Sequence, residues 1–190
     1  PTDSTEVLPG EAWLAFQSGF VTLSLQVLWT RMFAQVLDNS VYAFSAILVS
    51  FLVALAAGAW AAHGLARMRL SPVGVLYALL LTSGLLVALS PDSCFAITRG
   101  LESAGGDEDW AAYTHVVFEQ LAWVLLPPTI ALGGVFPWLM KVVEPSARRV
   151  GRTVGDLSAA NTAGAIAGSL IAGFVLLDLL GVWNAIRAMA

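Results

Sequence analysis

The chain has 190 residues, of which 58% are hydrophobic and 12% are charged, and its mean hydropathy is +0.79. Soluble globular domains are far more polar, so this composition excludes a water-soluble fold. A net charge of −4 leaves no positive excess with which to bind nucleic acid. One cysteine and two histidines exclude both a disulfide framework and a zinc cage, so we expect no metal and no cofactor in this chain.

Long uninterrupted apolar stretches predict an all-α, polytopic transmembrane bundle, because hydrocarbon offers no partner to open backbone groups. We expect a cytoplasmic tail at 1–10 and a transmembrane domain at 11–190. The five expected full spans are 11–37, 41–66, 72–90, 113–140 and 153–177, with an outer acidic loop at 91–112. A sixth span begins at 182 and is cut short at 190, so we expect the chain to be an excerpt of a longer protein.

Basic residues between the spans predict the orientation in the membrane. They follow the second span and the fourth, at Arg67, Arg69, Lys141, Arg148, Arg149 and Arg152. Because cytoplasmic loops carry the excess of Lys and Arg, we expect a multi-pass protein of the cell inner membrane with its N-terminus inside. Asp3, Glu6 and Glu11 replace the positive region that a secretory signal needs, so the first span stays in the membrane.

The first span carries a polar stripe with one residue every fourth position: Ser18, Thr22, Gln26 and Thr30. This stripe should face protein or water. Arg31 follows it near the outer end, where an unpaired charge costs at least about 2.5 kcal/mol. Three interpretations stay open for Arg31: it extends to the outer headgroups, it pairs with Glu119 or Asp178 at similar depth, or it faces a substrate.

Small residues at four-residue spacing predict close helix packing in two spans. Gly164 and Gly168 mark one face of the span 153–177, and Gly58 marks a face of the span 41–66. Small side chains let membrane helices approach closely. Asn161 and Thr162 either form hydrogen bonds across the packed face or line a cavity.

The span 113–140 contains five helix-breaking residues: Pro127, Pro128, Gly133, Gly134 and Pro137. Each proline removes a backbone donor and collides with the preceding turn. The break is either a kink that shapes the bundle or an interrupted helix of the kind that forms transporter binding sites.

No catalytic motif is present in the chain. The acidic, glycine-containing stretch 105–109 superficially resembles a nucleoside-binding loop, but no strand precedes it and the orientation rule places it outside. We expect it to be a solvated loop that at most attracts cations or polyamines weakly.

Several strings resemble the bacterial membrane-bound spermidine-synthase-like proteins, often described as fused major-facilitator/spermidine synthases. They are SGF at 18–20, QVLWTR at 26–31, SVYAFS at 40–45, PT at 128–129 with LGGVFP at 132–137, GR at 151–152, NTAGA at 161–165 and AGFVLL at 172–177. The resemblance implies major-facilitator-like packing and a cytoplasmic aminopropyltransferase domain, not present in this chain, that uses decarboxylated S-adenosylmethionine as co-substrate. Where the family usually has an acid, this chain has Gln26.

Three functions follow as expectations. In the first, the chain is a membrane module that anchors the synthase domain and feeds substrate to it. In the second, it is half of a secondary transporter for polyamines or another small cation, with Gln26, Arg31, Glu119, Asn161 and Thr162 as candidate pathway residues. In the third, it is a membrane enzyme acting on lipid, and Arg31 meets a headgroup. The lipid bilayer is a partner in each case.

Overall fold

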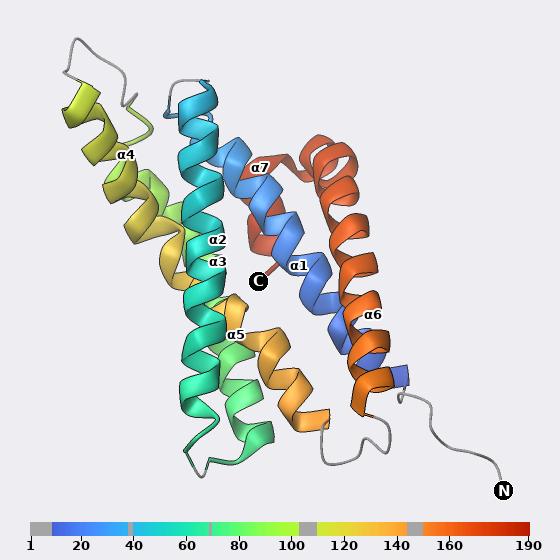
Figure 1. Ribbon diagram of the computed structural model, residues 1–190. Helices are drawn as coiled ribbons and strands as arrows, with labels where there is room; N and C mark the ends of the chain where they lie inside the picture. Colours follow the sequence, from blue (N-terminus) through green and yellow to red (C-terminus); the bar gives the residue numbers. More distant parts are fainter. Residues whose placement is uncertain (1–8, 38–39, 69, 103–109, 144–149) are drawn as a thin grey trace, which may run out of the picture.

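The computed structural model describes residues 9–37, 40–68, 70–102, 110–143 and 150–190, and every regular element in these ranges is helical (Figure 1). The all-α prediction is therefore confirmed. In chain order the elements are α1 (Pro9–Phe33), α2 (Val41–Leu65), α3 (Pro72–Ile97), α4 (Trp110–Val124), α5 (Leu126–Val143), α6 (Val150–Ile171), the π-helical turn η2 (Ala172–Leu176) and α7 (Leu177–Ala188). Most of the predicted tail, the stretch 105–109, Arg69, Arg148 and Arg149 lie outside the described residues.

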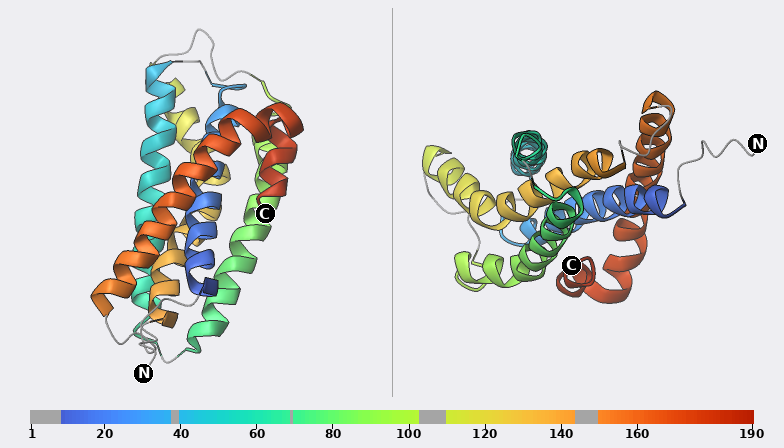
Figure 2. Two further views of the ribbon diagram at one scale, coloured as in Figure 1. Left: turned by 90° about the vertical axis from the view of Figure 1, so that its right-hand side faces the viewer. Right: turned by 90° about the horizontal axis from the view of Figure 1, so that it is seen from below.

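Four helical segments are long and apolar enough to cross a membrane: Val41–Leu65, Pro72–Ile97, Leu126–Val143 and Gly151–Ala188. The prediction of five spans plus the start of a sixth is not confirmed. The predicted first span, α1, is not one of the four. It carries the polar stripe and runs through the middle of the bundle (Figure 2), where other helices rather than lipid surround much of it.

The third span is longer than predicted, because α3 continues through Pro91 to Ile97. A proline in a helix leaves the carbonyl four residues earlier without its backbone donor. Here the Ser90 hydroxyl donates to that carbonyl, the Val87 oxygen, at 2.9 Å. The helix ends at Thr98, whose hydroxyl donates to the Cys94 carbonyl oxygen at 2.7 Å. Helix thus occupies the first part of the predicted acidic loop.

The two later spans also differ from their predicted form. The span 113–140 consists of two helices, since α4 ends at Val124 and α5 begins at Leu126. The predicted spans 153–177 and 182–190 are joined by helix, and the chain changes direction at Gly181, which has φ 69° and ψ 166°. A positive φ of this kind favours glycine. After Gly181 the chain returns alongside α3 (Figure 2).

Serine side chains cap the N-termini of two helices, α2 and α3. The Ser40 side chain accepts a hydrogen bond from the Ala43 N–H at 3.2 Å, and Ser71 accepts one from the Gly74 N–H at 3.3 Å. Such N-caps satisfy donors that have no partner inside the helix. Pro72 occupies the first turn of α3, where its missing N–H costs nothing.

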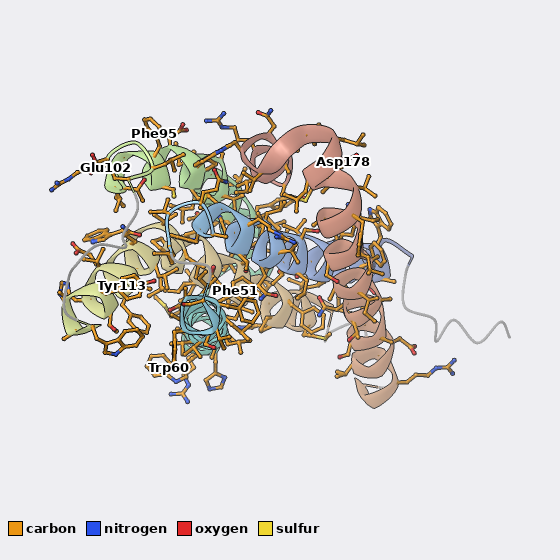
Figure 3. All side chains as sticks on the ribbon, turned by 90° about the horizontal axis from the view of Figure 1, so that it is seen from above. Phe51, Trp60, Phe95, Glu102, Tyr113 and Asp178 are labelled. Carbon is orange, nitrogen blue, oxygen red and sulfur yellow. The ribbon has the colours of Figure 1, made fainter. Side chains whose placement is uncertain are left out.

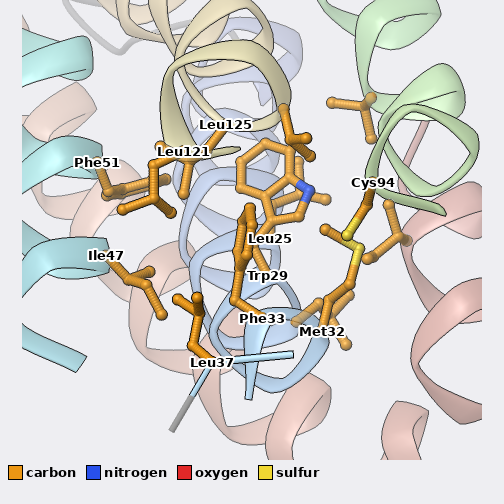
Figure 4. Close-up of a cluster of buried hydrophobic side chains, with 14 of the residues drawn as sticks. Leu25, Trp29, Met32, Phe33, Leu37, Ile47, Phe51, Cys94, Leu121 and Leu125 are labelled. Atoms are coloured by element: carbon orange, nitrogen blue, oxygen red, sulfur yellow. The ribbon is translucent and has the colours of Figure 1, made fainter. Parts of the chain in front are cut away.

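The main core lies around the second half of α1 (Figure 4). Trp29 is fully buried, and its indole N–H donates to the Ser90 hydroxyl oxygen of α3 at 3.0 Å. Its ring meets that of Phe51 edge to face, with 6.4 Å between the centroids. The other buried side chains of this core come from α1 to α5, η2 and α7, among them Leu25, Leu28, Met32, Phe33, Ile47, Val87, Cys94, Leu121, Leu132, Ala172, Ala185 and Ile186. This core joins α1 to helices from both halves of the chain.

Candidate functional site

The helices α1 and α6 run in the same direction and cross at backbone distance (Figure 1). A Cβ atom added to Gly19 would collide with the carbonyl oxygen of Asn161, and one added to Gly164 would lie 2.8 Å from the carbonyl carbon of Phe16. One added to Gly168 would lie 2.8 Å from the Ser24 hydroxyl, which donates to the Gly168 carbonyl oxygen at 3.0 Å. The crossing therefore requires glycine on both helices.

The helices α2 and α5 form a second crossing of the same kind. A Cβ atom on Gly58 would lie 3.0 Å from the Gly133 Cα and would collide with the carbonyl oxygen of Ile130. One on Gly133 would lie 2.5 Å from the carbonyl oxygen of Leu55. These two helices also run in one direction, opposite to that of α1 and α6 (Figure 1).

Three residues predicted to belong to a helix break lie inside α5 instead: Gly133, Gly134 and Pro137. The interruption is confined to Leu125, just before Pro127 and Pro128. Both prolines fall in the first turn of α5, where backbone N–H groups have no acceptor within the helix. The glycines serve the crossing with α2, and Pro137 leaves one carbonyl without its donor, that of Gly133.

The two crossings have matching registers. One offset in residue number relates Phe16 and Gly19 of α1 to Ile130 and Gly133 of α5. A second offset relates Leu55 and Gly58 of α2 to Asn161 and Gly164 of α6. In both crossings, a Cβ atom added to each of these glycines would collide with the equivalent backbone carbonyl. The pair α5–α6 thus repeats the packing positions of the pair α1–α2, and each helix runs in the direction opposite to that of its equivalent.

A cavity of about 430 Å³ lies between α2, α5 and α6, at the end of the bundle that carries Arg67, Lys141 and Arg152, which we call the basic end. The two titratable side chains in its lining are His63 and Lys141. The remaining lining is mostly apolar: Ala59, Ala62, Ala66, Pro137, Trp138, Met140, Val143, Thr153, Val154 and Leu157. We call this space the basic cavity.

Lys141 and Trp138 tie the basic cavity to the α2–α3 connection. The Lys141 ammonium donates to the Ala66 carbonyl oxygen at 2.6 Å and lies 4.8 Å from the centroid of the Trp138 ring. The Trp138 indole N–H donates to the Pro72 carbonyl oxygen at 2.6 Å. The orientation rule was the only role that the sequence predicted for Lys141. The spacing of Trp138 and Lys141 on one helix face was the available signal.

Two hydroxyls of the polar stripe of α1 form hydrogen bonds within their own helix. The Thr22 hydroxyl donates to the Ser18 carbonyl oxygen at 2.7 Å, and the Thr30 hydroxyl donates to that of Gln26 at 2.8 Å. Gln26 itself is half-buried. Of the two interpretations left open for Thr162, a cross-helix bond and a cavity position, the structure shows neither directly: its hydroxyl donates to the Ser158 carbonyl oxygen of α6 at 2.9 Å. Asn161 is half-buried and reaches the crossing through its backbone.

Arg31 does not form the predicted ion pair within the part of the chain that the structure describes. Arg31, Glu119 and Asp178 are all exposed, and Asp178 lies in the first turn of α7 (Figure 3). The Glu119 carboxylate instead lies 3.9 Å from the His115 ring, one turn earlier on α4. The interpretation that Arg31 extends to the headgroups agrees with this exposure.

Two buried side-chain oxygens near the α4–α5 interruption have no hydrogen-bond partner among the described residues, namely Gln120 Oε1 and Thr129 Oγ1. An unpaired buried polar group costs about 1–3 kcal/mol. The variant Thr129→Val keeps the shape and removes the hydroxyl, so we expect its thermal unfolding midpoint in detergent to rise. The control Thr114→Val removes a hydroxyl that has a partner, the Trp110 carbonyl oxygen, and should not raise the midpoint. A lower midpoint for Thr129→Val would contradict the expectation.

No protein-family model, no curated protein and no solved structure matches this chain. The fold defines the class as an all-helical bundle in which four helices have the length and composition of membrane-spanning helices.

Proposed function

We propose that the chain is a membrane module of the secondary-transporter kind, in which the space between α2 and α6 forms part of a path for a small solute. The observation that carries this proposal is the matching register of the two glycine crossings. Inverted repeats of this type are common in transporter folds, where the substrate site lies at the interface of the repeats. In this proposal α4 and α5 together form the fourth span, and the residues after Gly181 enter the sixth, as major-facilitator-like packing requires.

The repeat also relates the two ends of the path. The offset that relates Gly19 to Gly133 relates Gln26 to Met140, and the offset that relates Gly58 to Gly164 relates His63 to Ser169. Met140 and His63 line the basic cavity. Gln26 and Ser169, both half-buried, are therefore the polar residues that we assign to the opposite end of the path. Following the positive-inside rule, we assign the basic end to the cytoplasm of an inner-membrane protein.

The charge of the basic cavity bears on the choice of solute. Polyamines are the class that the family resemblance suggests, but a polyamine in this cavity would meet Lys141. Its described lining contains no carboxylate to oppose that charge. Like charges repel strongly where water is scarce. Uncharged or anionic solutes thus suit this end of the path better.

Transport is tested by uptake of labelled putrescine and labelled inorganic phosphate into proteoliposomes. We expect uptake of at least one of them above that of empty liposomes. Gln26→Ala should reduce it tenfold or more, because it removes the polar group assigned to the path. The control Gln35→Ala changes the same residue type at an exposed position after the end of α1 and should leave uptake unchanged. Equal uptake by the two variants, or none by the unchanged protein, contradicts the proposal.

Anchoring is the second candidate function, favoured by the strings that resemble spermidine-synthase-like proteins. In that case the module holds an aminopropyltransferase domain at the inner face and transports neither putrescine nor phosphate. A fusion of such a domain after Ala190 should then stay membrane-bound and use putrescine with decarboxylated S-adenosylmethionine. A fusion that is inactive, or that is active only after release from the membrane, would speak against anchoring.

A further inference from the structure

Lys141 places a fixed positive charge in the basic cavity. Its side chain is half-buried, and among the described residues no carboxylate lies within ion-pair distance of it. An ammonium group has three donors. One is used by the Ala66 carbonyl oxygen at 2.6 Å, and the Trp138 ring lies on another side at 4.8 Å. The protein thus fixes the position of the Lys141 ammonium group, and the group still has N–H donors and a positive charge with which to bind a ligand.

His63 is an exposed residue that also lines the basic cavity. Its Nε2 atom lies 3.4 Å from Nη2 of Arg67, one turn later on α2. A guanidinium donates and cannot accept, so a hydrogen bond in this contact requires Nε2 as the acceptor and the Nδ1–H tautomer of the ring. In that tautomer His63 has an Nδ1–H group as a second donor, and Arg67 adds positive charge next to the ring.

We propose that the basic cavity binds a phosphate group, held by Lys141 and His63. Phosphate and phosphodiester groups combine negative charge with several acceptor oxygens, which complements two donors and no carboxylate. A volume of about 430 Å³ falls within the range of small-ligand sites. Basic pockets between membrane helices on the cytoplasmic side bind anionic lipid headgroups. The same chemistry fits a soluble phosphate compound, so the experiment distinguishes these two sources.

The proposal names the ligand class of the cavity used in the proposed function, but binding at equilibrium does not require transport. The purified chain is reconstituted in nanodiscs of mixed phosphatidylcholine and phosphatidylglycerol, and the lipid retained after extraction into mild detergent is identified by native mass spectrometry. In a second arm, the delipidated protein in detergent is titrated with labelled inorganic phosphate. Retention of phosphatidylglycerol alone identifies the headgroup as the ligand, and binding of phosphate identifies a soluble source.

Substitutions in the lining decide whether the cavity is the site. We expect Lys141→Gln to lower retention or binding about tenfold, His63→Gln to lower it less, and Lys141→Arg to restore it. The control Arg152→Gln removes a cation at the same end that pairs with Asp156 at 3.8 Å and does not line the cavity, so binding should persist. Circular dichroism of each variant verifies folding. Equal binding in folded Lys141→Gln and Arg152→Gln, or no binding in either arm, overturns the proposal.

Discussion

Replacing Gly164 by alanine should lower the free energy of unfolding by about 2 kcal/mol or more, although the change adds a single methyl group. The added carbon would lie 2.8 Å from the carbonyl carbon and 3.0 Å from the Cα of Phe16, and both belong to the backbone. Overpacking of a core costs about 1–3 kcal/mol when side chains can adjust, and here only the helices themselves can move. An SDS titration monitored by circular dichroism measures the loss.

The matched control is Gly155→Ala, which changes the same residue type on the same helix. No atom lies within 4 Å of a Cβ placed on Gly155, and alanine favours a helix over glycine by about 1 kcal/mol. Stability should therefore stay equal or rise. The repeat predicts the same contrast in α2, where Gly58→Ala should destabilise and Gly64→Ala, which meets nothing within 4 Å, should not. Equal effects at Gly164 and Gly155 would refute the backbone crossing.

Trp29→Ala should destabilise the bundle by about 3–5 kcal/mol, the range for loss of a buried aromatic side chain. Trp29 has no exposed surface, contacts the Phe51 ring, and donates to Ser90. Trp29→Phe keeps a ring but not the donor, and should cost about 1 kcal/mol for the lost hydrogen bond, with a further loss for the smaller ring. Unfolding in SDS measures both variants.

Trp60→Ala provides the comparison for Trp29. Trp60 is 79% exposed and points away from the bundle (Figure 3). Its removal should change the unfolding free energy by less than about 0.5 kcal/mol, as for surface substitutions in general. If Trp60→Ala cost as much as Trp29→Ala, the core around α1 would be wrongly placed.

The sequence predicted those structural features that depend on a single helix. Apolar length predicted helices, and four-residue spacing singled out Gly58, Gly164 and Gly168. The break predicted over 127–137 is present, but it lies at Leu125, just before that range. The sequence was less informative for threonine. Hydroxyls at Thr22 and Thr162 suggested a polar path or a cross-helix bond, but a threonine in a helix readily donates to its own preceding turn.

The features that the sequence did not predict depend on which helices meet. Nothing in the local pattern shows that α5 packs on α2, so Gly133 was interpreted as a helix breaker instead of a contact residue. The same applies to the basic cavity, because His63 and Lys141 are far apart in the chain and come together only through that packing. The pairing of Arg31 with Glu119 was one of three interpretations and rested on depth alone, and equal depth does not place two side chains on facing surfaces.

The crossing at Gly58 has a geometrical consequence for movement of α2. Glycine surfaces lack the interlocking side-chain ridges that fix the angle between most packed helices, so at Gly58 backbone atoms alone limit a change in tilt of α2. With a rise of 1.5 Å per residue, a rotation of about 10° would displace the Val41 end of α2 by about 4 Å and the Leu65 end by about 2 Å in the opposite sense. The space beside α2 would thereby widen on one side of the membrane and narrow on the other.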